Sequence, residues 1–125
     1  DGTAGGLMIA EAFTFQENNT VGQVLRRLAS DEEDFEPYRG QHPYILDAEA
    51  RPVGVVSLRT LLTSKRSAPL SGVMSAPVTI NAQASLDELR DMFDKYNYLG
   101  IPVVEADGRL VGVVSRSAMD EAVLE

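Results

Sequence analysis

The chain has 125 residues, 44% of them hydrophobic, and its 19 Asp and Glu outnumber its 11 Lys and Arg for a net charge of −8. This apolar content argues against disorder and favours a globular fold with a shared core. The negative charge would repel DNA or RNA, and the absence of cysteine excludes disulfides and thiolate metal sites. No apolar run approaches the roughly 18 residues that span a bilayer, so we expect no direct membrane insertion of this segment.

The first half of the chain carries the signals of five elements separated by loops. The expected elements are a strand at 13–15, a helix from 21, an acidic loop at 31–37, strands at 44–46 and 53–57, and a helix at 58–62. The first helix is marked by Thr20-x-x-Gln23, a capping-box pattern. Apolar residues at helical spacing follow, so one face of this helix is predicted to be buried.

The second half repeats this order. The expected elements are a strand at 78–80, a helix from 86, strands at 101–104 and 110–115, and a helix at 117–124. Ser85-x-x-Glu88 is again a capping-box pattern, and Asp107-Gly108 is a hairpin signal. The polar stretch Thr63–Ser71 predicts a linker between the halves.

A duplicated stretch shows that the two halves are copies of one unit. Residues 48–57 and 106–115 are identical at seven of ten positions. We therefore predict an α/β (α+β) fold of two β-α-β-β-α repeats packed with pseudo-twofold symmetry. The first repeat, with an N-terminal lead-in, covers 1–67 and the second covers 68–125. The cleft between two such repeats is where we expect a ligand.

The Gly-Val-Val-Ser strand that runs into a helix in both copies resembles the CBS domain (the cystathionine-β-synthase motif). CBS domains occur in tandem pairs, which are regulatory modules that commonly bind adenine nucleotides. Three stretches further resemble the CBS region of MgtE-type magnesium transporters: 2–8, 55–59 and 95–104. That resemblance implies a preceding acidic domain, a following transmembrane domain, a homodimer formed through the CBS pair, and a cytoplasmic location at the cytosolic face of the membrane. A chain that starts at Asp1 rather than Met fits such an excised segment.

Catalysis is not expected. His42 is the only imidazole, and a histidine beside a proline at a strand end is also an ordinary surface residue. The chain has no phosphate-binding P-loop, and the Val-Val-Ser context of Ser57 and Ser115 is not a nucleophile elbow. The sequence therefore favours binding over chemistry.

The candidate nucleotide site lies in the first copy. A hydroxyl at a helix N-terminus, such as Ser57, can bind a phosphate or ribose. Arg59, in the first copy, could pair with phosphates, and the family resemblance adds Tyr98 and His42 for the base. CBS nucleotide sites usually carry an Asp three residues after the hydroxyl, where this chain has Thr60 and, in the second copy, Ala118. The alternative is that Arg59 and Tyr98 are surface and packing residues.

The candidate Mg²⁺ ligands are carboxylates, because Mg²⁺ prefers oxygen ligands and retains several waters. Asp87, Asp91 and Asp94 follow one another at i, i+4 and i+7 on a predicted helix, a pattern that a solvated helix face also shows. Asp120 and Glu121 lie on the last helix. Under the resemblance, Asp87 and Glu121 match Mg²⁺-binding positions, and Asn97 stands where an Asp is usual.

We therefore expect a non-enzymatic regulatory module, the Mg²⁺-sensing and gating part of an MgtE-type magnesium transporter. A module that binds an adenine nucleotide, ATP or AMP, is the first alternative. The second is a dimerisation scaffold whose ligand sites have decayed, because the ribose-binding Asp is absent from both copies.

Overall fold

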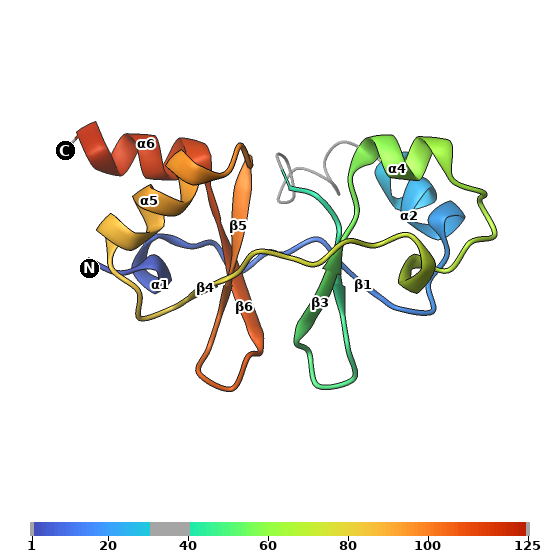
Figure 1. Ribbon diagram of the computed structural model, residues 1–125, viewed down its shortest axis with the longest axis horizontal. Coiled ribbons are helices and arrows are strands. Elements are labelled where there is room, and N and C mark those ends of the chain that lie inside the picture. Colours follow the sequence, from blue (N-terminus) through green and yellow to red (C-terminus); the bar gives the residue numbers. More distant parts are fainter. Residues whose placement is uncertain (1, 31–40, 125) are drawn as a thin grey trace. The chain divides into compact units, whose positions relative to one another are not determined.

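The computed structural model describes residues 2–30 and 41–124, which form two compact units (Figure 1). One unit covers residues 13–77, and the other combines residues 1–12 with 78–125. Each unit contains one three-stranded sheet in which the first two strands are parallel and the last two antiparallel. The predicted acidic loop at 31–37 lies outside the described residues.

The unit of residues 13–77 has the predicted order of elements. They are β1 (Thr14–Gln16), α2 (Val21–Leu28), β2 (Tyr44–Leu46), β3 (Pro52–Val55), α4 (Leu58–Thr63) and a 3-10 turn, η2 (Leu70–Gly72). The Thr20–Gln23 capping box is confirmed in both directions: the Thr20 hydroxyl accepts from the Gln23 amide, and the Gln23 side chain accepts from the Thr20 amide. The core is apolar and draws on both helices and the sheet, with Val24, Ile45 and Leu61 fully buried.

The other unit repeats the arrangement. Its elements are α1 (Ala4–Leu7), β4 (Ile80–Asn81), α5 (Leu86–Lys95), β5 (Gly100–Val104), β6 (Leu110–Ser115) and α6 (Arg116–Leu124). The Ser85 hydroxyl accepts from the Glu88 amide, which is one of the two bonds of a capping box. The buried residues Leu89, Val103 and Met119 join α5, β5 and α6 in one core. The predicted mixed fold with two repeated β-α-β-β-α modules is confirmed.

The segment before the first strand of each repeat packs on the sheet of the other repeat. Residues 1–12, expected as a lead-in to the first repeat, belong to the unit of the second. Ile9 exchanges two backbone hydrogen bonds of 2.9 Å with Val113, a residue of β6. Ser75, which lies before β4, the first strand of the second repeat, makes the same pair of 2.9 Å bonds with Val55 in β3. The compact units are therefore not the continuous halves 1–67 and 68–125, and that boundary remains a prediction about the repeats alone.

The predicted linker is also a packed segment. The carbonyls of Arg66 and Ala68 each accept a 2.9 Å hydrogen bond from an amide at the start of α2, namely Gly22 and Val21. Leu70 is fully buried in the core of the same unit. The polar composition of the segment is consistent with its hydrogen bonds to α2, because main-chain carbonyls rather than side chains accept those bonds.

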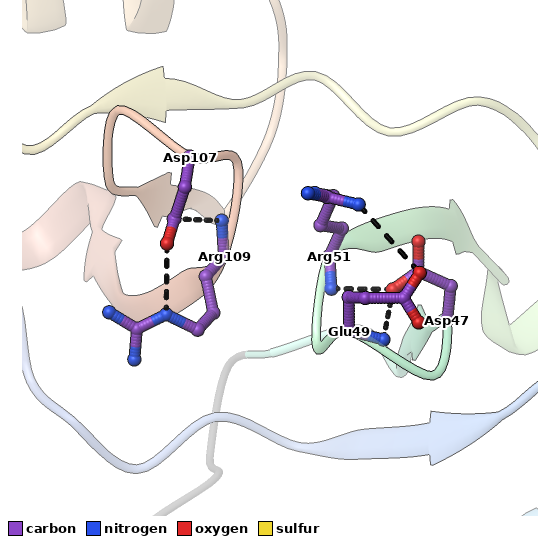
Figure 2. A network of polar contacts seen from close by, with 5 residues as sticks. All are labelled: Asp47, Glu49, Arg51, Asp107 and Arg109. Carbon is purple, nitrogen blue, oxygen red and sulfur yellow. Dashed lines mark hydrogen bonds and ion pairs between the residues drawn. The ribbon is translucent and has the colours of Figure 1, made fainter.

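Matching hairpin turns join the last two strands of each sheet (Figure 2). In the first, Asp47 Oδ1 accepts 2.9 Å hydrogen bonds from the amides of Glu49 and Arg51. In the second, Asp107 Oδ1 accepts from the Arg109 amide at 3.0 Å. Each turn also has an exposed ion pair, and such pairs add little to stability. Backbone hydrogen bonds within each turn, such as those from Asp47 to Arg51 and from Glu105 to Arg109, hold the turns together with these carboxylate acceptors.

The two turns differ at the residue with positive φ. Gly108 has φ 87°, and Ala50 occupies the same place with φ 63°. The left-handed conformation costs an L-residue with a Cβ about 1–2 kcal/mol, whereas glycine adopts it freely. We therefore expect Ala50→Gly to raise the free energy of unfolding by about 0.5–1 kcal/mol, after the entropy of the unfolded glycine is subtracted. Urea denaturation measures the shift in midpoint. Gly108→Ala is the mirror experiment and should lower the midpoint; a fall with both variants would contradict this account of the turns.

Candidate functional site

Ser57, Thr60 and His42 lie at one end of the sheet in the unit of residues 13–77. Ser57 is the N-cap of α4: its hydroxyl accepts from the Thr60 amide at 3.2 Å and donates to the Thr60 hydroxyl at 3.0 Å. The Val56 amide donates to the Pro43 carbonyl, so the antiparallel ladder of β2 and β3 continues toward His42 and Ser57. The structure thus brings three of the predicted nucleotide-binding residues to this end of the sheet. We call this end, together with the first turn of α4, the Ser57–Arg59 edge.

Helix α4 presents Arg59 to solvent beside this edge. Leu58 and Leu62 of the same helix are also exposed. An anion at the N-terminus of α4 would meet the Ser57 hydroxyl and backbone amides of the first turn, with the Arg59 side chain on the same short helix. Next to this edge, burial raises the pKa of the Tyr44 hydroxyl, which keeps that side chain neutral in the core.

The equivalent edge of the other unit keeps the serine hydroxyl but lacks the counterparts of Arg59 and Thr60. The Ser115 hydroxyl accepts from the Ala118 amide at 3.1 Å and shares a 3.1 Å hydrogen bond with the Ser117 hydroxyl. Ala118 stands where the first unit has Thr60, and Ser117 where it has Arg59. The unit of residues 13–77 therefore has more polar and positively charged side chains at this place that could bind an anion.

Tyr98, the predicted base-stacking residue, belongs to the other unit and lies just after α5. Its ring stacks on that of Tyr96, with centroids 5.3 Å apart and planes inclined by 8°. Lys95 places its ammonium 5.3 Å from the Tyr96 ring. Tyr98 is 36% exposed, and aromatic rings pair with planar groups by offset stacking, so a planar ligand is compatible with this residue. The predicted nucleotide set is thus divided between the two units.

The predicted metal ligands Asp87, Asp91 and Asp94 are all exposed on α5. Asp87 accepts a 2.9 Å hydrogen bond from Arg90 of the same helix. Asp120 and Glu121 are exposed on α6, and Asn97 is exposed just beyond the end of α5. Within residues 2–30 and 41–124, no three His, Asp or Glu side chains converge closely enough to hold a metal ion by themselves. The carboxylates form an exposed stripe, and their role as ligands stays a prediction.

One residue that organises this region was not predicted from the sequence. Arg116 opens α6, and its guanidinium donates 2.9 Å hydrogen bonds to the carbonyls of Phe93, Tyr96 and Tyr98. Aligning the repeats places Arg116 on Leu58, a charge opposite an apolar residue. That contrast between two otherwise similar copies was the available signal.

A family model for the CBS domain matches residues 4–66 and 70–125, which is nearly the whole chain. The chain belongs to the CBS domain family. It is 33% identical over 113 residues to the magnesium transporter MgtE of Thermus thermophilus. This alignment covers 90% of the chain but only 25% of that transporter, so the chain spans about a quarter of the relative.

Solved structures show the same CBS-pair fold. The cytosolic domain of the Mg²⁺ channel MgtE, in complex with ATP, superposes with a TM-score of 0.88 at 28% identity. That match covers 97% of this chain and 48% of the other. CBSX2 in complex with AMP superposes with a TM-score of 0.79 over 99% of this chain and 97% of the other, and at 21% identity it shows the fold alone. No helix of the described residues has the length and apolar character that crossing a bilayer requires.

Proposed function

We propose that this CBS pair is a regulatory ligand-sensing module, the cytosolic Mg²⁺-sensing and gating part of an MgtE-type magnesium transporter. The similarity to MgtE over 90% of the chain carries this proposal. The exposed carboxylates of α5 and α6 support it, because they are the oxygen ligands that Mg²⁺ prefers. The proposal includes an adjoining acidic N-terminal domain, a transmembrane domain and a homodimer formed through the CBS pair. It also places the module at the cytosolic face of the membrane.

Charge repulsion is the proposed physical basis of sensing. Asp87 and Asp91 lie one helical turn apart, and like charges at this spacing destabilise a helix. A hydrated Mg²⁺ needs only one or two carboxylates from one surface and completes its shell with water or with groups from a neighbour. Mg²⁺ would therefore draw acidic faces together and shift the population toward a compact state, and in the parent protein this state would close the pore.

Arg90 competes with the ion for Asp87. The ion pair between them is exposed at both partners, with 49% of the Arg90 side chain and 82% of the Asp87 side chain accessible. Exposed pairs of this kind contribute about 0–1 kcal/mol, so Mg²⁺ can displace Arg90 at small cost. Asp91 and Asp94 lie on the same helix, and their carboxylates are the other candidate ligands for the ion.

Adenine-nucleotide sensing is the second candidate, and the polar groups of the Ser57–Arg59 edge favour it. The MgtE cytosolic domain that superposes on this chain was solved with ATP. A phosphate at the α4 N-terminus would be stabilised by backbone amides and by Arg59. Thr60 and His42 would face the ribose and base. The missing carboxylate at Thr60 predicts weak binding.

Calorimetry with MgCl₂ and with ATP, titrated separately, tests these assignments. Saturable heat with MgCl₂ that disappears in Asp87→Asn supports the Mg²⁺ sensor. Saturable heat with ATP that disappears in Arg59→Ala supports the nucleotide module. Glu49→Gln, a carboxylate removed from the hairpin turn, is the matched charge control and should change neither titration. The absence of heat in both titrations would contradict both candidates and favour a dimerisation scaffold.

A further inference from the structure

We infer that Arg116 is a positioning residue that holds Tyr98 in the stacked orientation in which it can receive a planar ligand ring. This inference rests on the nucleotide-binding role proposed above for Tyr98, and it assigns the residue that sets the geometry of that part of the site. Arg116 itself is not proposed to touch the ligand.

The hydrogen bonds of Arg116 converge on the segment that carries Tyr98. Its Nε donates to the Tyr98 carbonyl, and its Nη2 donates to the carbonyls of Phe93 and Tyr96, all at 2.9 Å. The Arg116 amide adds a 2.8 Å bond to the Leu99 carbonyl. A single residue therefore binds four carbonyls between 93 and 99, which fixes the chain on both sides of the two tyrosines.

Electrostatics and packing favour this arrangement. The carbonyls at the end of α5 lack helical partners and lie at the negative end of the helix dipole, where a guanidinium is stabilised. Hydrogen bonds from a charged donor are about twice as strong as neutral ones. The guanidinium carbon also lies 5.0 Å from the ring centroid of the buried Phe93, a cation–π distance. Arg116 is thus held by a rigid core residue while it holds the exposed tyrosine segment.

Comparison of the two repeats shows that the fold does not require an arginine at this position. The first unit has Leu58 at the equivalent position, where it begins α4 and is 53% exposed. An apolar residue is therefore compatible with the start of this helix. Arg116 is an addition specific to the copy that presents Tyr98.

The tyrosine stack provides a readout that does not depend on any ligand. The chain contains no tryptophan, so its near-UV circular dichroism is dominated by four tyrosines. The contribution of the stack is defined as the difference between the wild type and Tyr98→Leu. Arg116→Leu, the residue of the first repeat, is expected to remove at least half of this difference while the far-UV spectrum is unchanged. Arg116→Lys keeps the charge but cannot span the same carbonyls with a planar fork, and it should remove a similar share.

Binding of AMP gives the second readout. If Arg116→Leu lowers the fraction of correctly oriented Tyr98 to a tenth, the AMP affinity should fall about tenfold. Arg109→Leu is the matched control, because Arg109 pairs with Asp107 in the hairpin turn between β5 and β6, and it should leave both readouts unchanged.

A folded Arg116→Leu variant with the full tyrosine signal would overturn the inference. So would an unchanged tyrosine signal in a folded Arg116→Lys variant if the leucine variant failed to fold. If the wild type binds no AMP, the nucleotide role fails, while the spectrum still decides whether Arg116 orients Tyr98.

Discussion

Replacing Gly112 by alanine is expected to lower the free energy of unfolding by about 3 kcal/mol, the range in which overpacking of a rigid site falls. Gly112 lies in β6, where the lead-in segment crosses it. An added Cβ would lie 2.5 Å from the Ile9 carbonyl oxygen and 2.6 Å from the Met8 sulfur. The carbonyl belongs to a backbone that Ile9 and Val113 hold with two hydrogen bonds, so it cannot move away without breaking them. Urea denaturation measures the loss.

The first repeat offers a graded series of controls for this variant. A Cβ at the equivalent Gly54 would overlap the Met74 sulfur, which a change of rotamer can move, and would lie 2.8 Å from the Met74 Cβ, which only a small backbone shift can move, so Gly54→Ala should cost about 1–3 kcal/mol. Gly72 has no atom within 4 Å of such a Cβ, and Gly72→Ala should change stability by less than about 0.5 kcal/mol. An equal loss in all three variants would contradict the account from packing, because an added Cβ at Gly72 meets no neighbouring atom.

Introducing a carboxylate at position 60 is expected to increase the affinity for AMP by about 10- to 100-fold. A carboxylate that accepts hydrogen bonds from ribose hydroxyls contributes about 1.5–3 kcal/mol, and each 1.4 kcal/mol is a factor of ten. Thr60 lies in the first turn of α4, where an acidic residue is favourable to the helix dipole, so Thr60→Asp should not destabilise the fold. Calorimetry with AMP measures the gain.

Two controls separate a ribose contact from a general effect of charge. Ala118→Asp places the same carboxylate at the equivalent position of the second repeat, which lacks the counterpart of Arg59, and should leave AMP affinity nearly unchanged. The 2′,3′-dideoxy analogue of AMP lacks both ribose hydroxyls, so it should gain nothing from Thr60→Asp. An equal gain with the analogue, or no gain with AMP, would contradict the assignment of a nucleotide site to this edge.

Local signals in the sequence predicted most secondary-structure elements of the fold. The Thr20–Gln23 cap and the strand at 44–46 have the predicted bounds because both depend on short-range chemistry. The exchange of the lead-in segments was missed because it joins residues such as Ile9 and Val113, whose pairing leaves no periodic pattern. A weak signal did exist: Gly6-x-Met8 recurs as Gly72-x-Met74, and these segments take the same place on the two sheets.

The candidate site could be predicted in part for the same reason. Ser57 and Thr60 are neighbours at the start of one helix, so their contact follows from helical spacing, and the exposed stripe from Asp87 to Asp94 follows in the same way. The bonds from Arg116 to three carbonyls could not be predicted, because they depend on how the start of α6 meets the end of α5. Main-chain acceptors have no residue-type signature in a sequence.

The most direct test of the proposed sensing function is an NMR titration of the ¹⁵N-labelled chain with MgCl₂, compared with NaCl at equal ionic strength. The account predicts saturable shifts of the amides from Asp87 to Asp94. These shifts should be lost in the Asp87→Asn/Asp91→Asn double variant and retained in Glu49→Gln/Asp107→Asn, which removes two carboxylates from the hairpin turns. Shifts that do not saturate, spread over all acidic surfaces and equal those caused by NaCl would contradict Mg²⁺ sensing by this helix.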